Sequence, residues 1–97
     1  MDSLDEIAAV MRANIPPGIT PRQFGQEVMR WGTGSAMARR RMATLTAGDM
    51  KRVGLTAEMA DNWAAAYDAV ARLMPNNPSA TGRAELMRHT ANLLRGV

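Results

Sequence analysis

The chain lacks several residue types from which small proteins build reactive sites and covalent cross-links. Its 97 residues include no cysteine and a single histidine, His89. The absence of cysteine excludes a disulfide framework and thiolate chemistry, and one histidine without cysteine cannot form a structural zinc site. No apolar run approaches the ~18 residues of a membrane-spanning helix. We therefore expect no metal, no cofactor and no membrane span.

Aromatic residues and lysines are also scarce. Four residues are aromatic and Lys51 is the only lysine, whereas the chain has nine methionines and a net charge of +3. Methionine fills irregular gaps in a core, which predicts a methionine-rich interior. The first charged residues are Asp2, Asp5 and Glu6, the opposite of the basic start of a secretory signal. We expect a cytoplasmic protein, or one exported without a cleaved signal peptide.

Helix-start signals are frequent, and no segment reads as a strand. Residues that commonly cap helices precede apolar segments of helical spacing at Ser3, Thr20, Ser35, Thr46, Thr56 and Asn77. They predict helices over residues 4–13, 21–31, 36–45, 47–53, 57–74 and 78–95. The sequence thus predicts one all-α domain over residues 1–97, a compact bundle of five to six short helices. Residues 20–95 form its expected core, and residues 1–15 form an N-terminal helix that packs more loosely.

The helix ends and the core have their own signals. Pro78 is expected at the first helical position of the last helix, where its missing N–H costs nothing. Gly32 is expected just beyond the helix over residues 21–31. In the long helix over residues 57–74, helical spacing places Met59, Trp63, Ala66, Tyr67, Val70, Leu73 and Met74 on one face. We expect both tryptophans to be buried together with Phe24 and Tyr67.

Residues 46–63 have the pattern of a helix-turn-helix unit. A short helix ends at Gly54, and Thr56 caps the next helix at once. A DNA-reading helix would, however, present Glu58 and Asp61, whose charges repel phosphates. We therefore do not expect nucleic-acid binding and retain a weak nucleic-acid binder only as an alternative.

The most basic segment consists of Arg39, Arg40 and Arg41. On a helix these side chains sweep about 200°, so Arg40 points away from the apolar face and the other two flank it. Such a run is typical of a solvated helix face. Because it follows the glycine-containing turn at residues 32–34, a phosphate site at the helix N-terminus is the alternative.

Arg83 and His89 complete the candidate binding residues. Arg83 lies on the apolar face of the last helix beside Gly82, so its guanidinium should be held by a carboxylate or by carbonyls near Pro75 or Gly32. This pattern indicates an internal clamp, and a functional anion contact is the alternative. His89 lies at the edge of the apolar face, and no neighbouring spacing is diagnostic of catalysis. We therefore assign no catalytic residue.

Three segments together resemble a small, uncharacterised all-helical domain family of Gram-negative bacteria. They are residues 30–34 (RWGTG), 55–63 (LTAEMADNW) and 75–87 (PNNPSATGRAELM). The resemblance covers residues 20–94. Members look like stand-alone proteins of this length or C-terminal parts of larger secreted proteins similar to polymorphic toxins. The resemblance implies a helical fold and a link to interbacterial secretion, and it transfers no catalytic residue.

These observations predict a non-enzymatic helical interaction module with a protein partner that the sequence does not identify. The resemblance adds a role accessory to, or part of, a bacterial secretion or toxin system. The chain is expected to be a monomer or a small homo-oligomer. A small toxin or effector domain with enzymatic activity, using Arg83 and His89, is the alternative beside the nucleic-acid binder described above.

Overall fold

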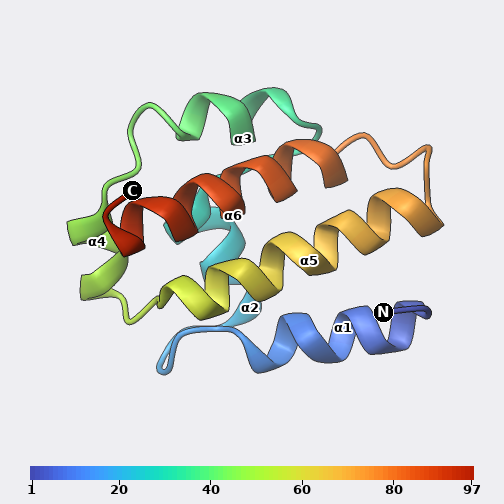
Figure 1. Ribbon diagram of the computed structural model, residues 1–97, viewed down its shortest axis with the longest axis horizontal. Coiled ribbons are helices and arrows are strands. Elements are labelled where there is room, and N and C mark those ends of the chain that lie inside the picture. Colours follow the sequence, from blue (N-terminus) through green and yellow to red (C-terminus); the bar gives the residue numbers. More distant parts are fainter.

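The computed structural model describes residues 1–97 and consists of helices and loops without a strand. Its helices are α1 (Leu4–Ala13), α2 (Pro21–Gln23), the π-helix η1 (Phe24–Met29), α3 (Ala36–Arg41), α4 (Ala47–Arg52), α5 (Ala57–Leu73) and α6 (Ala80–Arg95). Helix α5 lies between α1 and α6, and α3 lies along the opposite side of α6 (Figure 1). The prediction of a single all-α domain is confirmed. None of these helices has both the length and the hydropathy required to cross a bilayer.

Four of the predicted helix caps form as the sequence indicates. A side-chain oxygen accepts a hydrogen bond from the backbone N–H three residues later at Ser3, Thr20, Thr46 and Thr56. At Thr20 the reciprocal bond from its N–H to the Gln23 side chain completes a capping box. These contacts are local, so a sequence pattern is sufficient to find them.

The other two predicted caps differ from the structure: Ser35 is the N-cap residue of α3 as predicted but without a side-chain capping bond, and Asn77 does not directly precede α6. Ser35 makes no capping bond in α3, because its hydroxyl bonds to residues near α6 instead. Asn77 accepts hydrogen bonds from the N–H groups of Ser79 and Ala80. Helix α6 therefore begins at Ala80, and Pro78 lies before the helix rather than at its first position.

The segment predicted as one α-helix over residues 21–31 is a short α-helix followed by a π-helix. After one α-helical turn the chain widens into η1 and ends at Arg30, whose φ of 53° is left-handed. Gly25 permits close packing in this segment, because a Cβ there would lie 2.9 Å from Nε1 of Trp31. The missing side chain lets the Trp31 indole fold back against the helix. Arg30, and not Gly32, is thus the left-handed residue that ends this helix.

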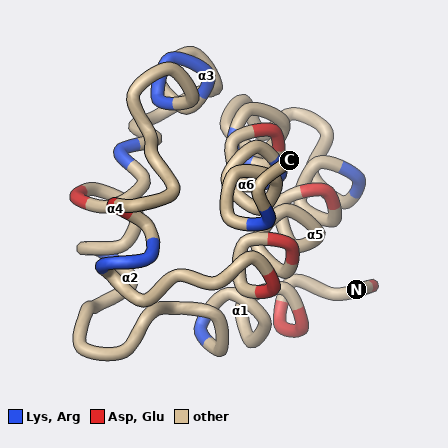
Figure 2. The backbone as a smooth tube through the Cα atoms, turned by 60° about the vertical axis from the view of Figure 1, so that its left-hand side comes forward, with Lys and Arg blue, Asp and Glu red and all other residues tan.

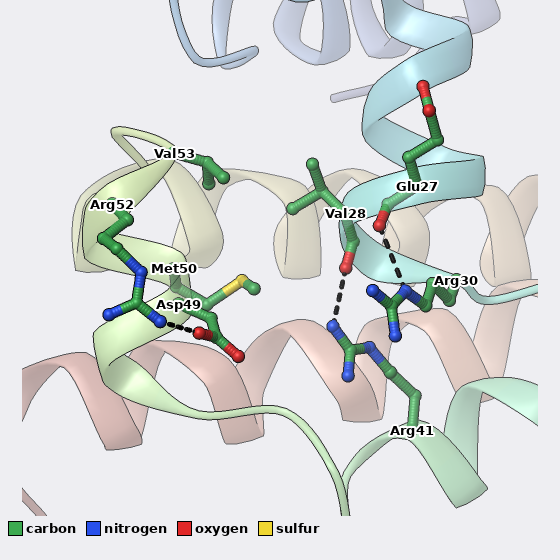
Figure 3. Close-up of a pocket in the computed structure, with 8 residues that line it drawn as sticks. All are labelled: Glu27, Val28, Arg30, Arg41, Asp49, Met50, Arg52 and Val53. Carbon is green, nitrogen blue, oxygen red and sulfur yellow. Dashed lines mark hydrogen bonds and ion pairs between the residues drawn. The ribbon is translucent and has the colours of Figure 1, made fainter.

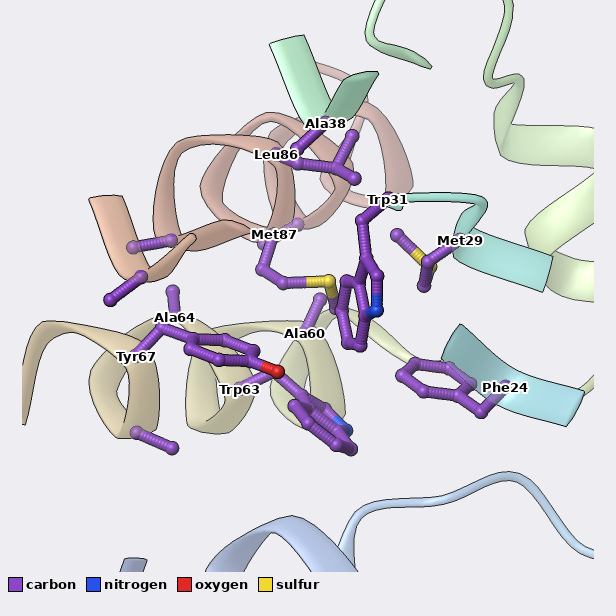
Figure 4. Close-up of a cluster of buried hydrophobic side chains, with 14 of the residues drawn as sticks. Phe24, Met29, Trp31, Ala38, Ala60, Trp63, Ala64, Tyr67, Leu86 and Met87 are labelled. Carbon is purple, nitrogen blue, oxygen red and sulfur yellow. The ribbon is translucent and has the colours of Figure 1, made fainter. Parts of the chain in front are cut away.

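The aromatic side chains form one buried cluster, as predicted (Figure 4). The ring centroids of Phe24 and Trp63 are 5.0 Å apart, and those of Trp31 and Tyr67 are 5.4 Å apart. Three methionines are buried beside other apolar residues, namely Met29, Met50 and Met87. The cluster joins η1, α5 and α6.

The two ends of α5 differ in how they pack against the rest of the fold. Leu73 and Met74 are exposed although helical spacing placed them on the buried face, because the chain leaves α5 at this point for the loop to α6. At the opposite end, Nε1 of Trp63 donates to the Asn14 carbonyl over 2.8 Å. With the buried side chain of Ile7, this bond attaches α1 to α5.

Candidate functional site

Arg83 is held between the two longest helices and the turn after η1. Its Nη1 donates to the hydroxyl of Tyr67 over 3.0 Å, and its Nη2 donates to the carbonyl of Gly32 over 2.6 Å. The guanidinium carbon also lies 4.9 Å from the centroid of a Trp31 ring, within range of a cation–π interaction. The predicted clamp is confirmed, and its partners are a carbonyl and a hydroxyl rather than a carboxylate.

The loop over residues 32–35 docks directly on the start of α6. The N–H of Gly34 donates to Oγ of Ser79 over 2.8 Å. The hydroxyl of Ser35 donates to the Pro78 carbonyl over 2.7 Å and accepts from the N–H of Gly82 over 3.0 Å. These bonds and the contacts of Arg83 fix the loop against α6. All the acceptors are neutral hydroxyl or carbonyl oxygens.

The segments that carry the family resemblance meet at this clamp. Residues 31–35 contact residues 78–83, and Trp63 of the second segment packs on Trp31. A shallow pocket of about 320 Å³ lies beside them, lined in part by Arg22, Thr33 and Arg83. Burial raises the pKa of the Tyr67 phenol, and the Arg83 charge opposes this rise. The phenol therefore stays neutral and serves as an acceptor for Arg83.

A second pocket lies between η1, α3 and α4 and has a volume of about 290 Å³ (Figure 3). We call it the arginine pocket, and its lining residues are Glu27, Val28, Arg30, Arg41, Asp49, Met50, Arg52 and Val53. Arg41 is only 8% exposed. Its Nη2 donates to the Val28 carbonyl over 2.9 Å, and its Nη1 donates to the Thr44 hydroxyl over 3.0 Å. The expectation that this arginine lies on a solvated helix face is therefore wrong, because the Arg41 side chain is buried.

The arginine pocket contains two cations without an ion-pair partner. Neither Arg30 nor Arg41 has a carboxylate within ion-pair distance, whereas Arg52 pairs with Asp49. Burial lowers the pKa of the Arg41 guanidinium, the charge of Arg30 lowers it further, and Asp49 opposes the change. The Nε of Arg41 is buried and makes no hydrogen bond. The chain thus supplies no counter-charge to either of these arginines.

The three consecutive arginines do not form one site. Arg39 leaves α3 toward α6 and pairs with Glu85, with Nε 2.8 Å from Oε2. This bond lowers the pKa of the Glu85 carboxyl. Arg40 is exposed to solvent and makes no ion pair. His89, on α6, is half-buried, lines none of the pockets and makes no side-chain hydrogen bond, so the fold does not bring it together with Arg83.

Basic residues gather on one side of the molecule. Residues 22–52 contain seven basic and two acidic residues, a charge of +5, whereas the whole chain carries +3. In Figure 2 the side formed by α2, α3 and α4 carries mainly blue segments, and red segments gather on α1, α5 and α6. We call the exposed residues on this side the basic face: Arg22, Arg30, Arg40, Lys51 and Arg52.

No group of three or more His, Cys, Asp and Glu side chains is placed to hold a metal ion. A sequence model of the family described as domain of unknown function (DUF4951) matches residues 3–94. The chain belongs to the DUF4951 family. No curated protein and no solved structure matches this DUF4951 domain. The membership agrees with the resemblance to an uncharacterised helical domain family.

Sequence reasoning did not assign two contributors to these sites in the DUF4951 domain, although Arg30 is near the basic segment in the sequence. Arg30 enters the arginine pocket because η1 ends there in a left-handed turn, which the pattern of an ordinary helix did not indicate. Ser35 was assigned to helix capping, although its partners are Pro78 and Gly82, more than forty residues away. No sequence signal distinguishes a capping serine from one with distant partners.

Proposed function

We propose that the protein is a non-enzymatic interaction module that binds an acidic protein partner through its basic face. The observation that carries the proposal is the charge of +5 on residues 22–52. Arg22, Arg30, Arg40 and Lys51 are exposed and make no ion pair, so their charges are available to a partner. Complementary charge steers association and selects partners of opposite sign.

The remaining arginines support this choice of face. Arg88 pairs with Asp68 and Arg95 pairs with Asp61, so these two arginines of α6 are already neutralised by α5. Four exposed basic residues without an ion pair thus lie on the basic face, against two elsewhere, Arg12 and Arg72. The exposed side chain of Met37 on α3 adds an adaptable apolar contact beside these charges.

We extend the proposal to a role in a bacterial secretion or toxin system. In this proposal the protein is cytoplasmic or is exported without a cleaved signal. It acts as a monomer or a small homo-oligomer. The family resemblance of residues 20–94 supports this part. A neighbouring gene for a secretion component or an immunity protein would support it further. Growth arrest on expression in bacteria would instead favour the toxin alternative with enzymatic activity.

The decisive experiment is a charge-reversal comparison. The immobilised domain captures proteins from the organism that encodes it, and each captured protein is purified and titrated against the domain. Its dissociation constant should rise at least about tenfold for the double variant Arg40→Glu, Lys51→Glu. The control Arg12→Glu makes the same kind of change on α1, at an exposed arginine without an ion pair. It should change binding less than about twofold.

Two results would overturn the proposal. Equal weakening by the double variant and by Arg12→Glu would show that the basic face does not select the partner. Sequence-dependent retention on duplex DNA at physiological salt would favour the nucleic-acid alternative, since binding by basic residues to phosphates falls steeply with salt whatever the sequence.

A further inference from the structure

We infer that the arginine pocket receives a single carboxylate group, held between Arg41 and Arg30. The inference rests on the proposed function, because an acidic side chain of the partner is the carboxylate that would enter a pocket on the basic face. It specifies where one contact with the partner lies and which groups make it. The N–H donors of two arginines would hold one carboxylate between them.

The first observation is that Arg41 is buried without a carboxylate partner. With 8% of its surface exposed, it makes only neutral hydrogen bonds, to the Val28 carbonyl and the Thr44 hydroxyl. A buried guanidinium is normally paired with a carboxylate, since burial of a charge without a partner is costly. A guanidinium has five N–H donors, and Arg41 leaves Nε among its unused ones. The chain itself thus supplies no counter-charge.

The second observation is the position of Arg30. Arg30 ends η1 in a left-handed conformation, and its Nε donates to the Glu27 carbonyl over 3.1 Å. Figure 3 shows the guanidinium groups of Arg30 and Arg41 facing one another. Two like charges in this arrangement repel each other, and an anion bound beside both would remove the repulsion.

The charges that line the pocket select the kind of anion. The lining contains three arginines, Arg30, Arg41 and Arg52, and two acidic residues, Glu27 and Asp49, which gives it a formal net charge of +1. Asp49 is occupied by Arg52 on the α4 side, and the carboxylate of Glu27 points away from Arg41 (Figure 3). A singly charged carboxylate balances this lining, whereas a phosphate dianion would exceed it and would approach Asp49. A planar carboxylate also matches the planar fork of a guanidinium.

Nuclear magnetic resonance of the arginine Nε–H groups tests the site directly. Sodium acetate is titrated into the intact protein while sodium chloride keeps the ionic strength constant. The Nε–H signals of Arg41 and Arg30 should shift with saturation, at a dissociation constant on the order of 10 mM for so small a ligand. A short peptide with one glutamate should compete with acetate for the same signals if the source is a protein side chain. Inorganic phosphate at pH 8 should bind more weakly than acetate.

Three variants connect the signals to the residues. Arg41→Lys keeps the charge but removes the fork, and it should weaken acetate binding at least about tenfold. Because this change could also impair folding, Arg30→Gly provides an independent variant: glycine accepts the φ of 53° and removes one of the two guanidinium groups. It should also weaken binding about tenfold. Arg40→Gln is the matched control, since Arg40 is exposed and does not line the pocket, and it should bind acetate normally.

The outcomes separate this inference from the proposed function. Absence of a saturable shift with acetate, equal shifts with chloride, or tighter binding of phosphate would each overturn the carboxylate site. The charge reversals of Arg40 and Lys51 do not alter the pocket lining, so the partner titration can still succeed when the acetate titration fails. Acetate binding with no competition by the glutamate peptide would overturn a side-chain carboxylate and assign the pocket to a free organic acid.

Discussion

Replacement of Gly82 by alanine should test whether close packing of the loop over residues 32–35 stabilises the fold. Gly82 lies in the first turn of α6, where its N–H donates to Oγ of Ser35. A Cβ at this position would lie 2.7 Å from the Cα of Ser35. Because the obstructing atom belongs to the backbone, no rotamer change can make room, and the loop must move away from α6.

The expected loss of stability follows from three contributions. Overpacking of a core contact costs about 1–3 kcal/mol. Movement of the loop weakens the bonds of Ser35 to Gly82 and Pro78, each worth about 1 kcal/mol. Alanine returns at most about 1 kcal/mol through its higher helix propensity. Gly82→Ala should therefore lower the free energy of unfolding by about 2–3 kcal/mol, balancing these contributions. The melting temperature should fall by roughly 10–20 °C.

Gly48→Ala is the matched control for this experiment. Gly48 is also helical, but a Cβ there would meet only Nη1 of Arg52 at 3.7 Å, an ordinary contact. Its stability should be unchanged or higher by up to about 1 kcal/mol. Both variants are compared with the parent protein by chemical denaturation followed by circular dichroism. If Gly82→Ala is as stable as Gly48→Ala, the close approach of loop and helix does not stabilise the fold as described.

Three further predictions concern the core, the clamp and the exposed ion pairs. Trp63→Ala should lower the free energy of unfolding by about 3–5 kcal/mol; a solvent-exposed indole emission from both tryptophans of the folded parent would contradict this. Arg83→Lys and Arg83→Ala should each cost about 2 kcal/mol, because an ammonium cannot replace the planar fork; parent-like denaturation midpoints for both would refute the clamp. Ion pairs lower the pKa of Glu85 and Asp61 from their ordinary values of 4.5 and 3.8. Their stabilisation is therefore complete above these values and is lost as the pH falls through the lower folded-state pKa. Solvent screening keeps the loss small, and normal carboxyl titration midpoints in the folded protein would contradict it.

Much of this fold was accessible from the sequence because the determining contacts are local. Thr46 and Thr56 cap helices by bonds to residues three positions later, and helical periodicity placed Trp63 and Tyr67 in the core. Bonds and faces of this kind depend only on neighbouring residues and on the 3.6-residue repeat of the helix. The sequence also placed Arg83 on an inward face, from which a held guanidinium followed.

Packing between helices determines how the three consecutive arginines differ from one another. Arg39, Arg40 and Arg41 are consecutive and chemically identical, yet one pairs with Glu85, one is solvated and one is buried against Val28. Their partners lie on other helices, so no local pattern distinguishes them. The same holds for the packing of Trp31 against Gly25 in η1, and for the left-handed conformation of Arg30, which lines the arginine pocket. Local residue patterns specify which segments are helical and which faces are apolar, whereas long-range packing specifies which charges remain free to bind.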